Sequence, residues 1–164
     1  MNAATFAPTL MTFLAALAMP TSVGAAVVGD SASCAAGRPA LKVRVSGFKR
    51  EAGLLHIALY ERGGWLRKGA SLKKLKVPVT GGTVDVCIAV PGPGDYGLAV
   101  HHDIAGDKKR DRGDGAGFSR NPQLSLMGRP SFAATGIAVG DGVRPIGIEL
   151  RYLNGLSIGP ARRG

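Results

Sequence analysis

Four aspartates recur through one stretch of the chain at a spacing that suits a calcium ion. With Asp103 as position 1, Asp107 stands at position 5, Lys109 at 7, Asp111 at 9 and Asp114 at 12. These are ligand positions of the twelve-residue calcium loop, in which position 7 supplies its backbone carbonyl. Ca²⁺ takes six or more hard oxygen ligands, and alternate residues of a tight loop can converge on it. The spacing makes this loop a candidate calcium site.

The same loop departs from the calcium pattern in both shape and charge. Ala105, at position 3, has no side-chain oxygen, and Lys108, at position 6, replaces the glycine of the sharp turn. The last position is Asp rather than the longer Glu, and Lys109, Arg110 and Arg112 offset the carboxylate charge. Two interpretations therefore stay open: a calcium-stabilised loop, and a solvated polar loop held by Asp–Arg pairs and Asx turns.

Three histidines suggest a transition-metal site as a further alternative. His101 and His102 are adjacent in a predicted strand, so their side chains point to opposite faces and cannot both reach one ion without a bend. His56 lies on a different predicted strand. Because His102 shares a face with Leu98 and Val100, we expect it to be partly buried and hydrogen-bonded to loop backbone.

A serine that follows the loop suggests a hydrolase in which Ser119 would act with His102. However, residues 117–121 lack the second glycine of a nucleophile elbow, and no strand–turn–helix pattern surrounds them. The structural alternative is that Phe118 packs the loop onto the core while Ser119 and Asn121 hydrogen-bond its backbone. We therefore predict a non-enzymatic protein with no catalytic residue, and a candidate ligand site formed by His102, Phe118, Ser119 and Asn121.

The elements that must position these residues are predicted to be β-strands. Apolar and polar residues alternate over 41–48 and, less regularly, over 54–60. The polar turn 49–53 between them predicts a β-hairpin. The same reasoning predicts further strands over 83–90, 96–102, 131–139 and 145–153.

A short segment around Pro78 is predicted to be an edge strand. Proline cannot donate a hydrogen bond to a neighbouring strand, so it is confined to sheet edges. Lys73, Lys74 and Lys76 precede it, and lysines on an edge strand discourage edge-to-edge aggregation. The alternative for this lysine cluster is a binding patch.

The strand pattern favours one all-β domain. About seven short strands with regular turn signals, and no convincing amphipathic helix, predict an antiparallel β-sandwich of the immunoglobulin or prealbumin type. A small closed barrel is the competing architecture. Residues 103–129 show no strand pattern, and loops of this length within compact domains are usually functional or mobile. We therefore expect any function to lie within the loop from Asp103 to Pro122.

The N-terminal residues are predicted to be a secretory signal. No charged side chain precedes Asp30, and the apolar run 10–18 is followed by small residues that suit a signal peptidase. This run is roughly half of the ~20 residues that a membrane span needs. The chain is therefore expected to be exported, to the periplasm or the extracellular space. The predicted organisation is a signal peptide over 1–25, an N-terminal lead-in over 26–40 and a single β-sandwich domain over 41–164.

Two cysteines agree with an oxidising compartment. The chain has an even number of cysteines, Cys34 and Cys87, and neither belongs to a CxxC pair that would suit zinc. We predict a disulfide between them, worth roughly 4 kcal/mol by the loop-entropy model, with two free thiols as the alternative. Cys87 lies on the strand face opposite Val84 and Val86, so that face is expected to be covered.

The net charge of +10 favours anionic partners, such as lipopolysaccharide, phospholipid head groups or acidic polysaccharide. Nucleic acid fits less well, because aromatic residues make up only 5% of the chain and no basic stretch is interleaved with stacking rings. A generic cationic surface is the alternative.

Two segments of the chain carry a family resemblance. They are 96–103, Tyr-Gly-Leu-Ala-Val-His-His-Asp, and 114–122, Asp-Gly-Ala-Gly-Phe-Ser-Arg-Asn-Pro. With the loop between them they resemble the bacterial exported family known as domain of unknown function 2141. The resemblance extends from about Leu41 to Tyr152 and implies an exported β-sandwich with no established activity. Members typically read His-Asp-x-Asn-x-Asn-Gly-x-x-Asp here, whereas this chain has Ala105, Asp107 and Lys108 in place of Asn, Asn and Gly.

Overall fold

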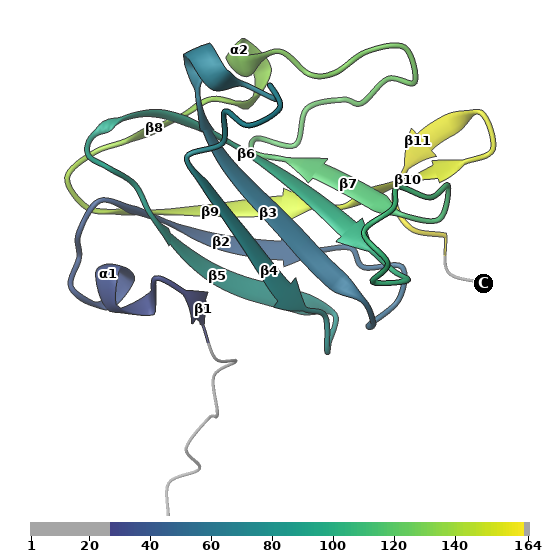
Figure 1. Ribbon diagram of the computed structural model, residues 1–164, viewed down its shortest axis with the longest axis horizontal. Coiled ribbons are helices and arrows are strands. Elements are labelled where there is room, and N and C mark those ends of the chain that lie inside the picture. Colours follow the sequence, from purple (N-terminus) through teal and green to yellow (C-terminus); the bar gives the residue numbers. More distant parts are fainter. Residues whose placement is uncertain (1–26, 163–164) are drawn as a thin grey trace, which may run out of the picture.

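The fold is two β-sheets packed face to face (Figure 1). The computed structural model describes residues 27–162, so the predicted signal peptide lies outside the described residues. One sheet has the strand order β1-β5-β2-β9, and the larger has β11-β10-β7-β6-β3-β4 with β8 paired to β6. The strands are β1 Val28–Gly29, β2 Ala40–Ser46, β3 Leu54–Glu61, β4 Lys73–Pro78, β5 Thr83–Ala89, β6 Gly94–Asp103, β7 Gly115–Phe118, β8 Ile137–Val139, β9 Val143–Glu149, β10 Arg151–Asn154 and β11 Ser157–Gly159; the helices are α1 Ser31–Ala35, η1 Arg62–Gly64 and α2 Phe132–Thr135.

The predicted all-β sandwich is confirmed, while its immunoglobulin or prealbumin type stays a prediction. Most strand pairs are antiparallel, but β9 runs parallel to β2, and β1 runs parallel to β5. Among the described residues, no helix is long and apolar enough to cross a membrane.

The core lies between the two sheets and follows from the period-2 pattern of their strands. In β2, Val43 and Val45 are buried while Lys42 and Arg44 are exposed. Successive strand residues point to opposite faces, so each strand turns one apolar row toward the other sheet. Burying each such side chain stabilises the fold by about 1.5–3 kcal/mol.

The predicted hairpin over 41–60 is wrong, because β2 and β3 belong to different sheets. Both strands turn an apolar row toward the same core, but from opposite sides of it. The connection between them passes from one sheet to the other and contains Gly47 and Gly53, whose φ angles are 80° and 84°. A Cβ at Gly53 would collide with the backbone carbonyl of Asp103, so only glycine fits this close approach.

The predicted strand over 145–153 is also corrected, because it is two strands in two sheets. β9 pairs with β2, and β10 pairs with β7. The chain changes sheets at Leu150, whose N–H donates to the carbonyl of Ser46 at 2.9 Å. Ile148, Leu150 and Tyr152 are all buried. The alternation of buried and outward-facing residues therefore continues through the corner, and the sequence pattern does not indicate where one strand ends and the next begins.

Two further predictions are corrected in the stretch that follows β6. A short strand, β7, interrupts the predicted loop 103–129, and α2 occupies part of the predicted strand 131–139. β7 was not apparent because it contains two glycines in four residues, Gly-Ala-Gly-Phe. A Cβ at Gly115 would lie 2.6 Å from the Tyr152 ring, and one at Gly117 2.8 Å from Ile148 Cγ2. Core side chains fill the space that the Cβ of any other residue would need.

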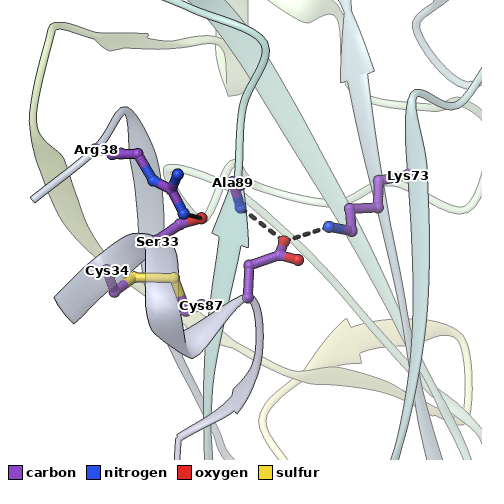
Figure 2. Close-up of a disulfide and its surroundings, with 7 residues drawn as sticks. Ser33, Cys34, Arg38, Lys73, Cys87 and Ala89 are labelled. Atoms are coloured by element: carbon purple, nitrogen blue, oxygen red, sulfur yellow. Dashed lines mark hydrogen bonds and ion pairs between the residues drawn. A yellow bond between two sulfur atoms is a disulfide. The ribbon is translucent and has the colours of Figure 1, made fainter. Parts of the chain in front are cut away.

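The predicted edge strand and the predicted disulfide are both confirmed. β4 forms one edge of the larger sheet, and Lys74 and Lys76 are exposed on it. The disulfide joins Cys34 of α1 to Cys87 of β5, with a Cα–Cα distance of 6.2 Å (Figure 2). Cys87 is fully buried, so the outward face of β5 is covered there as expected.

Asp30 fastens the N-terminal segment to both sheets beside the disulfide. Its carboxylate accepts a hydrogen bond from Ala89 N–H at 2.8 Å and forms an ion pair with Lys73 of β4. Burial disfavours the charged form, but the hydrogen bonds from Lys73 and Ala89 outweigh it and hold the pKa of Asp30 below its ordinary value.

Candidate functional site

The candidate site lies where the loop after β6 covers the outer face of the larger sheet. The antiparallel register of β3 and β6 places His56 directly opposite His101. Their rings stack with centroids 5.8 Å apart and an interplanar angle of 30°. Cross-strand pairs of this kind contact each other directly, so two imidazoles form the floor beneath the loop.

Asp103, the last residue of β6, is buried and folds the start of the loop. One carboxylate oxygen accepts the N–H of Gly106 at 2.7 Å, and the other accepts the N–H of Lys108 at 2.9 Å. His56 Nε2 lies 3.5 Å from the same carboxylate. Burial disfavours the charged form of Asp103, but these backbone hydrogen bonds outweigh it, and the pKa of Asp103 is below its ordinary value.

Asp114 closes the other end of the loop. Its Oδ1 accepts the N–H of Ile104 at 3.2 Å, and its Oδ2 accepts the N–H of Asp111 at 3.0 Å. The Nε2 of His101 lies 3.0 Å from the same Oδ2. The two carboxylates therefore serve as acceptors for loop backbone that would otherwise lack partners.

These four residues, His56, His101, Asp103 and Asp114, form what we call the carboxylate–histidine cluster. Burial lowers the pKa of His56 more strongly than the neighbouring Asp103 raises it. The Nε2 of His56 is buried and makes its 3.5 Å contact with Asp103 without hydrogen-bond geometry, so it has no hydrogen-bond partner among the described residues.

His102 faces the core on the opposite side of β6. It is fully buried; its Nδ1 lies 2.8 Å from the hydroxyl of Tyr152, and its Nε2 lies 2.8 Å from the carbonyl of Ala52. The Tyr152 hydroxyl also accepts the N–H of Lys49 at 3.0 Å. A carbonyl only accepts, so Nε2 carries the proton and Nδ1 accepts from Tyr152. Burial lowers the pKa of His102 and favours the neutral ring. The histidine was expected to be partly buried and bonded to loop backbone; it is fully buried, and the backbone that it contacts is that of the β2–β3 connection.

Ser119 is engaged by backbone rather than by a histidine. Its buried hydroxyl accepts the N–H of Leu98 at 2.9 Å and donates to the carbonyl of Thr135 at 2.6 Å. His102 pairs with Gly115 and not with this end of β7. The structure therefore does not bring the serine and the histidine of the hydrolase hypothesis together.

Asn121 and Phe118 hold the chain after β7 against its surroundings. The Asn121 side chain donates to the carbonyl of Gly147 at 3.2 Å and accepts the N–H of Glu149 at 2.8 Å, as a neighbouring strand would. The ring of Phe118 packs against Trp65, with centroids 6.1 Å apart. Both residues act structurally, although they contact the edge of β9 and an outer aromatic cluster rather than the loop's own backbone and the core.

The predicted calcium ligands are only partly brought together. Asp103 and Asp114 lie at the two ends of the loop, whereas Asp107 and Asp111 are exposed, and Asp107 accepts the N–H of Lys109 at 2.9 Å. Within residues 27–162, no three His, Cys, Asp or Glu side chains are arranged so that they could hold a metal ion. Calcium binding stays a prediction.

The basic side chains of this end point outward. Lys108, Lys109, Arg110 and Arg112 are exposed on the loop. The neighbouring Lys49 and Arg50 line a hollow of about 290 Å³ between the β2–β3 connection and the loop. We call these six residues the basic loop surface.

Sequence reasoning missed the pairing of His56 with His101. The pairing depends on the register between β3 and β6, two strands 45 residues apart at this pair. The available signal was parity: residues two apart share a face, so His101 had to face away from Leu98 and Val100.

The fold and the site define a small β-sandwich domain with a carboxylate-anchored loop at one end of its larger sheet. Residues 43–146 match a family model described as an uncharacterized protein conserved in bacteria (DUF2141), and the chain belongs to this family. The resemblance noted from the sequence is therefore confirmed. No curated protein and no solved structure shows a significant match.

Proposed function

We propose that this chain is an exported, non-enzymatic β-sandwich module that binds an anionic component of the cell envelope through the basic loop surface. The observation that carries the proposal is the division of charge within the loop. Asp103 and Asp114 turn inward and accept backbone N–H groups, while Lys109, Arg110 and Arg112 remain exposed. Asp107 and Asp111 are also exposed, but the six residues of the basic loop surface outnumber them, so the surface presented to a partner carries an excess of positive charge.

The net charge of the whole chain supports an anionic partner. Further carboxylates are paired within the fold: Asp85 accepts two hydrogen bonds from Arg44, and Asp30 pairs with Lys73. Most lysines and arginines of residues 27–162 are exposed. Such an imbalance attracts anionic surfaces and raises the rate at which they are encountered.

The disulfide supports a location outside the cytoplasm. Structural disulfides persist in oxidising compartments and are rare in the cytosol. The bond between Cys34 and Cys87 ties the segment that would follow a cleaved signal peptide to the middle of β5. This is compatible with export and with a domain that starts near the predicted cleavage site.

The hydrogen bonding of Ser119 and His102 favours a binding module over the hydrolase alternative. The single hydroxyl proton of Ser119 goes to the carbonyl of Thr135, and both ring nitrogens of His102 are engaged within the core. A nucleophilic serine needs a base within hydrogen-bond reach. If Ser119→Ala abolished a hydrolytic activity of the purified protein, the non-enzymatic proposal would fail.

The proposal is tested by titrating the mature protein with lipopolysaccharide and, separately, with an acidic polysaccharide, while binding is followed by calorimetry. We expect saturable binding that weakens as salt is added. The variant Lys109→Gln/Arg110→Gln removes two exposed charges from the basic loop surface and should weaken binding about tenfold. The two titrations distinguish a phosphate-bearing from a carboxylate-bearing partner.

A matched control removes the same charge elsewhere. Arg38 and Arg144 are exposed near the starts of β2 and β9, away from the loop. Arg38→Gln/Arg144→Gln should leave binding within about twofold of the unmodified protein if the loop is the contact surface. Equal weakening by both double variants would show that only the net charge matters and would contradict the proposal.

A further inference from the structure

An exposed apolar tip stands at the other end of the larger sheet, on the loop that joins β7 to α2. Residues Ser125 and Gly128 form an isolated β-bridge, and the N–H of Met127 donates to Ser125 Oγ at 3.1 Å. Leu126 is 53% exposed and Met127 is 95% exposed. A tight turn holds these two large apolar side chains outward. They contribute little to the core and are accessible to another molecule.

The loop that carries this apolar tip, Leu126 and Met127, is fixed to the fold at several points. The indole N–H of Trp65 donates to the carbonyl of Pro130 at 2.8 Å. Arg120 donates to the carbonyl of Ala133 at 2.9 Å. Side-chain anchors of this kind hold the base of the loop, so the tip projects from a fixed position.

Four exposed basic residues lie on the loop that carries the apolar tip or in the segment beside it. Arg129 reaches the carbonyl of Leu66 at 3.5 Å, which places the tip's own loop beside the segment that follows η1. Arg67 and Lys68 in that segment are exposed, as are Arg120 and Arg129. Residues 119–131 contain no acidic residue, so nothing in the loop offsets this charge.

We propose that the apolar tip inserts into the surface of an anionic phospholipid bilayer while the surrounding arginines and lysine contact the head groups. Apolar side chains projecting from a cationic rim are the combination that interfacial binding requires, since burial and electrostatic attraction add. Each basic side chain near an anionic membrane surface strengthens binding about fivefold. Two apolar side chains alone would give only weak, transient contact, and the cationic rim makes the contact stable.

This surface is separate from the basic loop surface. Glu61, at the end of β3, pairs with Tyr96 near the start of β6, whereas the basic loop surface follows Asp103 at the end of β6. The apolar tip neighbours η1 and therefore lies at the β3 end. The inference does not rest on the proposed function, and each surface can be removed without the other.

The test is co-sedimentation of the mature protein with vesicles of phosphatidylglycerol and phosphatidylcholine in equal amounts, with pure phosphatidylcholine vesicles for comparison. We expect partition into the anionic vesicles only. Leu126→Ser/Met127→Ser should reduce it about tenfold, and Lys68→Gln about fivefold. Trp65, the only tryptophan of the chain, lies beneath the loop and gives a fluorescence readout of contact at this end.

The matched control is Leu156, which is 93% exposed in the turn between β10 and β11. Leu156→Ser should partition like the unmodified protein. Absence of partition by the unmodified protein, or unchanged partition of the Leu126→Ser/Met127→Ser variant, would overturn the inference. Loss of partition only in Lys109→Gln/Arg110→Gln would overturn it as well and assign membrane contact to the basic loop surface. If the tip variant instead abolished self-association without changing partition, the tip would be a contact between two copies of the chain.

Discussion

The two faces of β6 use neighbouring histidines in opposite ways. His102 faces the core, where Tyr152 and Ala52 engage both ring nitrogens. His101 faces outward, where it stacks on His56 and contacts the carboxylate of Asp114. The residue type is the same, and the partners differ: a hydroxyl and a carbonyl on one side, carboxylates on the other.

The comparison shows that the partner decides what a histidine does. A hydroxyl and a carbonyl satisfy the neutral ring of His102. Protonation would turn Nδ1 into a donor, so the Tyr152 hydroxyl would face two donors, Nδ1–H and the N–H of Lys49, and would lose its own donation. On the outer face, the Asp114 carboxylate that contacts His101 also accepts N–H groups of the loop. The inner face of β6 is thus closed and structural, while the outer face shapes the loop that we propose to be functional.

The largest effect is expected from removing the inner histidine. His102→Ala leaves a cavity in the core and buried polar groups without partners at Tyr152 and Ala52, and should lower the free energy of unfolding by about 4 kcal/mol. His101→Ala removes a partly exposed contact and should cost about 1 kcal/mol. Urea unfolding monitored by circular dichroism measures both values, and equal losses would contradict the division between the two faces.

A smaller effect is expected from the outer face at Asp103. Asp103→Asn keeps one acceptor oxygen but presents an amide N–H₂ to a backbone N–H, so one of the two hydrogen bonds from Gly106 and Lys108 is lost. The free energy of unfolding should fall by about 2 kcal/mol. Asp107→Asn, in the exposed part of the same loop, is the control and should stay within about 0.5 kcal/mol. Amide hydrogen exchange at Gly106 and Lys108 should speed up only in the Asp103 variant.

The pH dependence of stability should come from both faces. Burial lowers the pKa of His102 and of His56 below their unfolded values, so below pH of about 6.5 the unfolded chain binds protons that the folded chain does not. Stability is therefore complete above this pH and falls as the pH decreases through it. The lowered pKa of Asp103 adds a second loss below pH of about 4.

The variant His56→Gln separates the two histidines. It removes the contribution of the outer face, so the decrease in unfolding free energy between neutral and mildly acidic pH should become smaller without vanishing, because His102 remains. Thermal melting across this pH range is the measurement. An unchanged pH profile in the variant would show that His56 is protonated equally easily in the folded and unfolded chain.

Much of the fold could be predicted from local patterns. Alternation located β2, β3, β5 and β6 to within a few residues, and Pro78 with its lysines identified the edge strand. The disulfide followed from an even number of cysteines in a chain with a predicted signal. These inferences succeeded because burial of one strand face and the missing N–H of proline are properties of single segments.

The sheet assignment could not be predicted in the same way. Alternation shows that a strand has one buried face but not which sheet it joins, so the β2–β3 crossing and the corner at Leu150 were missed. β7 was missed because its glycines are required by close packing against Tyr152 and Ile148, residues more than thirty positions further along the chain. Long-range packing, rather than local preference, decided these elements.

The candidate site likewise has features that the local sequence indicated and features that depend on long-range packing. The loop was identified from its length and its aspartates, and these aspartates do organise it. The sequence left two interpretations of these aspartates open, a calcium site and a polar loop held by Asp–Arg pairs and Asx turns, and the structure gives backbone N–H groups as partners of Asp103 and Asp114. The candidate ligand role of His102 stays a prediction, although His101 is the histidine that contacts a loop carboxylate. Parity alone separates the two faces of a strand without saying which one the loop covers.

The smallest effect is expected from calcium. Asp103 and Asp114 accept five contacts from N–H groups and His101 between them at 3.2 Å or less. A calcium ion would have to compete with these donors, and Lys108 at the turn adds a positive charge beside them. We therefore expect millimolar calcium, compared with chelator, to leave the melting temperature unchanged, although a ligand bound only by the folded state must raise it. A saturable rise, with amide shifts confined to residues 103–114, would show that the loop exchanges its internal hydrogen bonds for the ion, and the outer face of β6 would then be a metal-ordered surface rather than a self-supporting one.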